Sequence, residues 1–210
     1  MNELGPPAVI ATARKMGITT PIPEYLSVAI GSAEGTLLEM VSAFSSYPNQ
    51  GVRMTPIFGI EVTDREGNVI EQARPESHDA LRADTAYIMT NMLQGVILRG
   101  TATRAASLDW PLGGKTGTTD DATDAWFIGF DPDITIGVWV GFDQKKPIGQ
   151  GQSGTVAALP IWIDVMKAWT TDRRAKGLPI PEFTRPGNVV LVQLPSGTEA
   201  FIAGTEPVIR

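Results

Sequence analysis

Residues 112–119 bring one cation, three hydroxyl groups and bare backbone together in a single short stretch, Leu-Gly-Gly-Lys-Thr-Gly-Thr-Thr. Lys115 offers an ammonium group, and Thr116, Thr118 and Thr119 offer hydroxyl donors. The interspersed glycines, Gly117 among them, leave the backbone uncovered, so a ligand can lie directly against it. This pattern predicts an edge that binds an anion or polarises a carbonyl group.

Two other kinds of site do not fit the residues. A phosphate-binding loop requires a glycine five positions before Gly114, where Asp109 stands, and a helix afterwards, where strand-forming residues follow. A carboxylate metal site has the right residue type but the wrong spacing for a calcium loop, so we interpret these acids as solvated turn residues and predict no metal. The acids concerned are Asp120, Asp121, Asp124, Asp131 and Asp133.

The composition is that of one large globular domain, or of a domain with a tail: 210 residues, 42% hydrophobic and 19% charged. A net charge of −6 argues against nucleic acid as a partner. The absence of cysteine excludes disulfides and thiolate sites, and the single histidine excludes a multi-histidine metal site. We expect that histidine, His78, to lie in an exposed loop.

The first half of the chain predicts helices and one hairpin. Prolines and a closing glycine bound a helix over 8–16, and a capping box at Thr36 opens a helix that runs to about Tyr47. Between them, 27–32 is either a short strand or a buried loop. Segments 57–63 and 68–72 form a hairpin, and a helix runs from a cap near Asp84 to Gly100.

The second half predicts an antiparallel sheet. Apolar residues alternate over 134–142, a strand joined by a short turn to a second strand over 125–130, which pairs with the Lys115 segment. A helix over 156–169 covers this sheet with a wide apolar face of Ile161, Trp162, Val165, Met166 and Trp169. We expect residues 1–175 to form one domain and 176–210 a proline-rich tail with one strand near 189–192.

Lys-Thr-Gly is also one of three sequence elements of the penicillin-interacting serine enzymes, beside Ser-x-x-Lys and Ser-x-Asn. From about residue 5 to 170 the chain resembles the C-terminal part of the transpeptidase domain of class A (bifunctional) penicillin-binding proteins. The matching segments are 35–40, 49–51, 100–102, 114–119, 124–130, 137–143 and 159–162.

The resemblance implies an α/β (α+β) fold, with helices flanking a five-stranded antiparallel sheet, and a serine DD-transpeptidase that cross-links peptidoglycan stem peptides and is trapped by β-lactams. It implies that Lys115 and Thr118 are catalytic, Lys115 through its positive charge and Thr118 through its N–H in the oxyanion hole. Thr116, Gly117, Thr118 and Thr119 would bind substrate, with the hydroxyls of Thr116 and Thr118 holding its terminal carboxylate. No cofactor is implied.

The other two family elements are missing from the chain. No serine is followed by lysine three positions on or by asparagine two positions on, so there is no nucleophilic serine. Tyr47-Pro48-Asn49 mimics a variant of the second element, but it falls at a helix end, and we interpret it as a coincidence. The resemblance therefore implies a C-terminal portion of a longer protein.

In that longer protein the first strands, the nucleophile helix, a glycosyltransferase domain and a membrane anchor all lie upstream. The resemblance places such a protein at the periplasmic or extracytoplasmic face of the bacterial inner membrane. Two other functions stay open. One is a non-catalytic binding or scaffold module that retains the cleft edge, and the other, which fits the chain less well, is a stand-alone β-lactamase.

Overall fold

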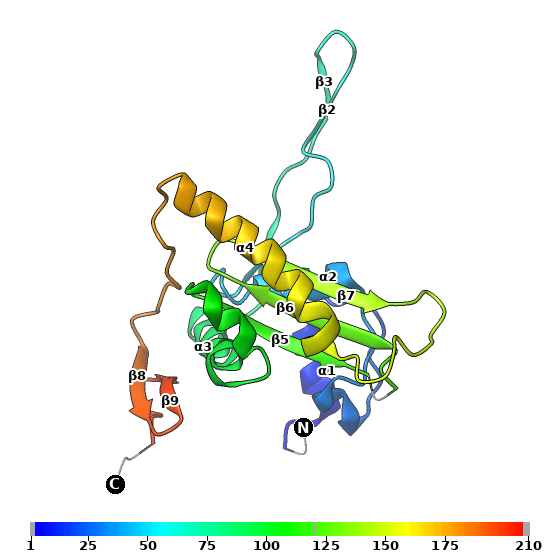
Figure 1. Ribbon diagram of the computed structural model, residues 1–210. Helices are drawn as coiled ribbons and strands as arrows, with labels where there is room; N and C mark the ends of the chain where they lie inside the picture. The colour runs from blue at the N-terminus through cyan, green and yellow to red at the C-terminus, as the bar shows by residue number, and fades with distance from the viewer. Residues whose placement is uncertain (1–2, 120, 208–210) are drawn as a thin grey trace.

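The computed structural model describes residues 3–119 and 121–207 (Figure 1). Its centre is a three-stranded antiparallel sheet in the order β5-β6-β7. The strands are β5 (Gly113–Thr118), β6 (Asp124–Phe130) and β7 (Thr135–Gly141). This confirms the predicted sheet and the predicted pairing of the Lys115 segment with the strand of Trp126.

Helices lie on both sides of this sheet, while one hairpin projects from the body as an arm and another lies beside α3 (Figure 1). The helices and helical turns are α1 (Gly5–Lys15), η1 (Leu26–Ile30), α2 (Leu37–Ser45), α3 (Ala83–Arg99), η2 (Thr103–Leu108), η3 (Gly154–Ala158) and α4 (Leu159–Ala175). The other strands are β1 (Val52–Met54), β2 (Glu61–Thr63), β3 (Val69–Gln72), β4 (Ser77–Asp79), β8 (Val189–Leu194) and β9 (Gly197–Ile202).

Helices pack on both faces of the sheet because glycines leave room for them. A Cβ at Gly129 of β6 would lie 2.7 Å from the ring of Trp162 in α4. On the opposite face, a Cβ at Gly137 of β7 would lie 2.4 Å from Val41 in α2. The two helices therefore approach the sheet more closely than any side chain at these positions would allow.

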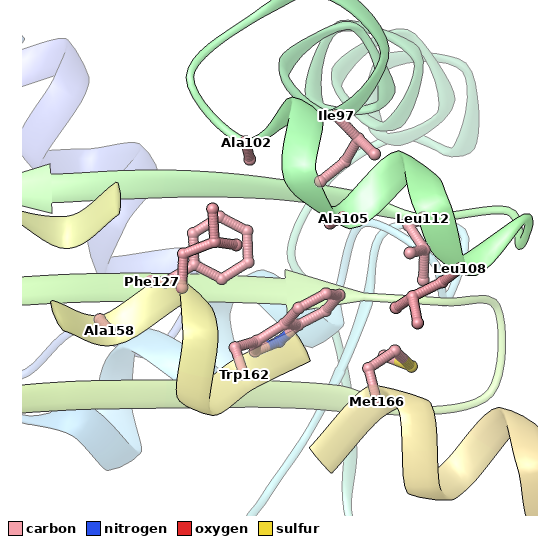
Figure 2. Close-up of a cluster of buried hydrophobic side chains, with 10 residues drawn as sticks. Ile97, Ala102, Ala105, Leu108, Leu112, Phe127, Ala158, Trp162 and Met166 are labelled. Carbon is pink, nitrogen blue, oxygen red and sulfur yellow. The ribbon is translucent and has the colours of Figure 1, made fainter. Parts of the chain in front are cut away.

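The main core lies between the sheet and α4 (Figure 2). Trp162 is fully buried and meets the ring of Phe127 edge-on, with 5.0 Å between ring centroids. Its indole N–H donates to the carbonyl of Ile136 at 3.1 Å, so its one polar atom is satisfied. Burial of a large side chain of this kind contributes about 1.5–3 kcal/mol.

The buried stripe of α4 is narrower than the sequence predicts. Trp162 and Met166 are buried as expected, but Ile161 and Val165 are 48% and 47% exposed. A single helix lying across a sheet buries only the stripe that faces it, and here that stripe also includes Leu159. The outer flank of α4 is consequently apolar and uncovered.

A buried carboxylate fastens the end of the sheet opposite the turn that follows Thr118. Asp131 lies in the β6–β7 turn, but the prediction that it is solvated is wrong: it is fully buried and accepts hydrogen bonds from the indole N–H groups of Trp110 and Trp169, each at 2.9 Å. It also accepts from the backbone N–H groups of Asp133 and Ile134. One side chain thus ties the turn to the segment after η2 and to α4.

Removing this carboxylate should destabilise the fold. Asp131→Ala leaves two indole N–H groups without their acceptor in a buried site, so we expect the free energy of unfolding to fall by about 3 kcal/mol. Asp131→Asn keeps one acceptor oxygen and should lose less. Chemical denaturation measures both, with Asp164→Ala, an exposed carboxylate on α4, as control. Equal effects of Asp131→Ala and Asp164→Ala would contradict this role.

A second carboxylate organises the N-terminal segments. The capping box predicted at Thr36 is present, and Glu39 completes it. The Glu39 carboxylate also accepts hydrogen bonds from the backbone N–H and hydroxyl groups of Thr19 and Thr20. These bonds, those from the Thr19 and Thr20 side chains first, hold the pKa of Glu39 well below its usual range. Glu39 therefore ties the connection after α1 to the start of α2.

The lowered pKa of Glu39 predicts a pH dependence of stability. A carboxyl whose folded pKa lies below its unfolded pKa stabilises the fold above the unfolded value, and this contribution is lost as the pH falls further. We expect Glu39→Gln to cost about 1–2 kcal/mol at neutral pH, since water screens a part-exposed carboxylate.

The difference between Glu39→Gln and the unmodified chain should shrink as the pH falls below about 4.3. Denaturation curves at several pH values measure this difference. Glu24→Gln, which alters an exposed carboxylate, is the control. A difference that stays constant down to pH 3 would refute the role of Glu39.

Residues 27–32 are neither a strand nor a buried loop. Leu26–Ile30 forms the 3₁₀ helix η1, which ends at Gly31 in the left-handed region. Leu26 and Ile30 are 58% and 88% exposed. The apolar run thus marks an uncovered surface, which periodicity alone cannot distinguish from a buried segment.

A narrow arm leaves the body between α2 and α3 (Figure 1, cyan). Its base is the antiparallel pair β1–β4, and its tip is the predicted hairpin β2–β3, whose residues are all exposed. His78 is exposed as expected, but it lies in strand β4 and not in a loop, with its Nε2 2.9 Å from the hydroxyl of Thr55. A three-residue strand is too short to show a period in the sequence.

The chain beyond α4 folds back onto α3. It forms the hairpin β8–β9 where the sequence predicts one strand. Arg99 of α3 pairs with Glu199, and the side chain of Asn91 accepts from the N–H of Ala200. Asp84 stands in the first turn of α3 rather than at its cap, and its carboxylate accepts from Arg82 and Asn188.

Candidate active site

Strand β5 forms one edge of the sheet, and its glycines set how closely it packs. A Cβ at Gly113 would lie 2.8 Å from the ring of Phe130, and a Cβ at Gly114 would lie 2.7 Å from the ring of Phe127. Only hydrogen fits at these positions without displacing an aromatic ring. The first two residues of β5 are therefore fixed against β6, and the rest of the strand carries Lys115, Thr116 and their neighbours.

The backbone of β5 turns alternate groups toward its free side. The N–H of Thr119 donates to the carbonyl of Asp124 at 3.2 Å, and the next pair in the register is Thr118 with Ala125. Hydrogen-bonded and non-hydrogen-bonded pairs alternate in an antiparallel ladder. The N–H of Thr118 and the carbonyl of Thr116 therefore point away from β6. A fixed outward N–H is what stabilisation of an oxyanion requires.

Lys115 and the two following threonines lie on opposite faces of the sheet. Lys115 aligns through β6 with Gly137, the position where α2 packs. Thr116 pairs with Phe127, which packs against α4. Thr118 is two residues further on and shares the face of Thr116. The strand thus offers a cation on one face and two hydroxyls on the other.

The Lys115 side chain is exposed and reaches back to the strand edge. Its Nζ donates to the outward carbonyl of Thr116 at 2.8 Å. This contact holds the ammonium beside the row of outward backbone groups. A negative charge bound along this edge would meet both the ammonium and N–H donors.

The hydroxyl of Thr119 closes a turn, and the substrate-binding role that the resemblance implies for Thr119 stays a prediction. Its hydroxyl oxygen accepts from the N–H groups of Thr123 and Asp124, each at 3.0 Å, and lies 2.9 Å from the hydroxyl of Thr123. Because Thr123 donates its own hydrogen to Asp124, Thr119 supplies the hydrogen between the two hydroxyls. The hydroxyl of Thr119 is therefore engaged within the turn, and Thr116 and Thr118 are the hydroxyl donors left for a ligand.

Two tryptophans, Trp126 and Trp139, lie on the same face of the sheet as Lys115. Trp126 of β6 is half-buried, and its ring centroid lies 6.3 Å from that of Trp139 in β7. The indole N–H of Trp139 donates to Asp124 at 2.9 Å. The expected turn over 120–124 occurs next to this pair, although Asp120 itself lies outside the described residues. Trp126 is thus partly packed and partly open to solvent on this face.

Two segments without a predicted role contact the threonines. The hydroxyl of Thr101, after α3, lies 3.0 Å from the hydroxyl of Thr116. The N–H of Gly154, at the start of η3, donates to the hydroxyl of Thr118 at 3.0 Å. The only signal in the sequence is the match of 100–102 to the family, and that match assigns no role to Thr101.

Two other candidates from the sequence, a carboxylate metal site and Asn49, form no site in the described residues. In residues 3–119 and 121–207, no three metal-ligating side chains gather closely enough to hold an ion. The side chain of Asn49 donates to the carbonyl of Val52 in the turn after α2, a local contact. No helix in this part of the chain is both long and apolar enough to cross a membrane.

Comparison with known proteins gives the family. The sequence model of the family "Penicillin binding protein transpeptidase domain" matches residues 21–167. The chain belongs to this family. Penicillin-binding protein 1A of Aquifex aeolicus (strain VF5) is 39% identical over 218 residues, which cover 99% of this chain and 29% of that protein. Penicillin-binding protein 1A of Neisseria gonorrhoeae is 37% identical over 167 residues, which cover 77% of this chain and 21% of that protein. The predicted resemblance to class A penicillin-binding proteins is confirmed.

Solved structures show the same mixed α/β fold. Penicillin-binding protein 1A from Haemophilus influenzae matches with a TM-score of 0.88 and 24% identity, covering 99% of this chain and 38% of that one. PonA1 from Mycobacterium tuberculosis in complex with penicillin V matches with a TM-score of 0.68 and 23% identity, covering 86% of this chain and 53% of that one. The chain spans less than a third of the penicillin-binding proteins 1A named above from A. aeolicus and N. gonorrhoeae.

The contact at Gly154 predicts a sensitive position. A Cβ there would lie 2.4 Å from the carbonyl oxygen of Trp126 and 2.6 Å from that of Gly117. We therefore expect Gly154→Ala to push η3 off the strand, break the bond to Thr118 and lower the melting temperature by several degrees. Gly187→Ala, which enters open space, is the matched control. Equal melting temperatures for the two variants would show that the close contact of η3 with β5 does not contribute to stability.

Proposed function

We propose that this chain forms the substrate-binding wall of a serine DD-transpeptidase that cross-links peptidoglycan by acyl transfer. The observation that carries the proposal is the arrangement on β5: an outward N–H at Thr118, two hydroxyls on one face and the Lys115 ammonium at the edge. Membership of the transpeptidase family supplies the reaction.

In this proposal each group has one task. The hydroxyls of Thr116 and Thr118 donate to the terminal carboxylate of a D-Ala-D-Ala stem peptide. The N–H of Thr118 donates to the carbonyl oxygen as it becomes an oxyanion, and losing one such donor typically costs about 3–4 kcal/mol of barrier. Gly117 keeps the strand bare between the two threonines. Lys115 supplies positive charge and aids proton transfer at the nucleophile.

The nucleophilic serine comes, in this proposal, from a preceding part of a longer protein. Three uncovered surfaces support this. Strand β7 is the other edge of the sheet formed by the described residues, and no residue of that strand is fully buried. The flank of α4 at Ile161 and Val165 is exposed, as are Leu26 and Ile30 of η1. Two further strands on β7 would complete a five-stranded sheet.

β-Lactams and stem peptides are the proposed ligands of this edge, and no cofactor is required. Among structures of the same fold, PonA1 is in complex with penicillin V, and penicillin-binding protein A from M. tuberculosis is an imipenem acyl-enzyme. The proposed location is the periplasmic or extracytoplasmic face of the inner membrane, with a glycosyltransferase domain and a membrane anchor on the preceding segment. The boundary between residues 1–175 and the tail 176–210 remains a prediction.

One sequence observation favours a second function. The chain contains neither Ser-x-x-Lys nor Ser-x-Asn, so a non-catalytic binding or scaffold module that keeps the cleft edge has the same sequence support. Such a module would bind stem peptides or β-lactams without forming a covalent bond.

Covalent labelling separates the two functions. We expect fluorescent penicillin to leave this chain unlabelled and to label a protein in which a preceding segment carrying Ser-x-x-Lys is joined to it. In the joined protein, Lys115→Ala should reduce the labelling rate by at least tenfold. Gel fluorescence after denaturation measures the covalent product.

Two results would count against the transpeptidase. Labelling of this chain alone would show that it holds its own nucleophile. A joined protein that binds penicillin without covalent labelling would favour the non-catalytic module. Lys176→Ala, which removes an exposed lysine at the end of α4, is the matched control for charge.

A further inference from the structure

The hydroxyl of Thr118 is set up to donate to a ligand. Its oxygen is 3.0 Å from the nitrogen of Gly154, and a backbone N–H can only donate. Thr118 is therefore the acceptor in this bond. A hydroxyl has one hydrogen and two acceptor positions, and the hydrogen of Thr118 has no acceptor among residues 3–119 and 121–207.

The hydroxyl of Thr116 lies on the same face and also contacts one neighbouring segment. Its hydroxyl oxygen is 3.0 Å from that of Thr101, and either oxygen can be the donor. If Thr101 donates, the hydrogen of Thr116 is free and both strand threonines present O–H donors. If Thr116 donates, its hydrogen is spent on Thr101 and an anion meets a lone pair. An anionic ligand selects the first arrangement.

The backbone of Thr101 is held firmly enough to define this contact. A Cβ at Gly100 would lie 2.8 Å from Val96, so the chain turns tightly off α3. Ala102 is fully buried in the main core. The hydroxyl of Thr155, next to Gly154, donates to the carbonyl of Thr101 at 3.4 Å. The two segments that contact the strand threonines therefore also contact each other.

We propose that Thr101 is a positioning residue of the carboxylate subsite: its hydroxyl donates to Thr116 and directs the hydrogen of Thr116 toward the ligand carboxylate. This inference rests on the proposed function, which assigns the carboxylate to Thr116 and Thr118. Thr101 touches no ligand itself. Its donated hydrogen occupies one acceptor position of the Thr116 hydroxyl and fixes the rotation of that hydroxyl, as the N–H of Gly154 does for Thr118.

The test is a non-covalent titration of this chain, followed through the threonine methyl signals by NMR. The probes are benzylpenicillin and its methyl ester, which lacks the carboxylate charge. We expect benzylpenicillin to shift the signals of Thr116 and Thr118. Thr101→Val keeps the shape and removes the hydroxyl, and it should weaken the affinity by about three- to tenfold.

Two further variants separate positioning from packing. Thr101→Ser keeps the hydroxyl and should bind benzylpenicillin like the unmodified chain. Thr103→Val makes the same change at an exposed threonine at the start of η2 and should have no effect. The methyl ester should bind weakly and equally to all four proteins, and their melting temperatures should agree.

The inference fails if Thr101→Val binds benzylpenicillin as well as the unmodified chain does. It also fails if Thr101→Ser is as weak as Thr101→Val, or if benzylpenicillin shifts neither strand threonine. The proposed function fails by a different readout, the absence of covalent labelling in the joined protein. The two failures are therefore distinguishable.

Discussion

The packing of Trp162 on the sheet determines where everything near β5 lies. The indole occupies the space left by Gly129, meets the ring of Phe127 edge-on and donates to the carbonyl of Ile136, so α4 has one position along the sheet and one depth. Since α4 follows η3 without a break, the position of α4 also places Gly154 of η3 against the backbone of Gly117. The hydrogen bond to Thr118 thus follows from a core contact and needs no local stabilisation of its own.

Much of the fold follows from patterns that the sequence displays openly. The alternation in β7 and the short turn before it predict the antiparallel pairing, and the capping box at Thr36 predicts the start of α2. Lys115, Thr116 and Thr118 lie where the pairing with β6 requires. The features that escaped prediction are contacts between segments distant in the chain. Thr101 contacts Thr116, and Gly154 contacts Thr118, because the core packs their segments together, and no period or spacing in the sequence predicts these contacts.

Thr119 shows the limit of reading chemistry from residue type. It belongs to the same hydroxyl-rich run as Thr116 and Thr118, and nothing in the run separates the three. What separates them is their place relative to the strand end. Thr116 and Thr118 stand within β5, while Thr119 is the first residue of the turn and satisfies the N–H groups of Thr123 and Asp124. A hydroxyl at a turn is used by its own backbone before any ligand arrives.

The arm formed by β2 and β3 has a practical consequence. Its tip is closed by Asp64, whose carboxylate accepts from the N–H groups of Glu66 and Asn68, and Gly67 takes the left-handed conformation there. These contacts are internal to the tip, and the strands behind it pair with each other. A tag or a fluorescent domain inserted between Glu66 and Gly67 would therefore alter contacts within the arm only and leave β5 undisturbed. The arm is the natural attachment point for reporters or surface immobilisation of this protein.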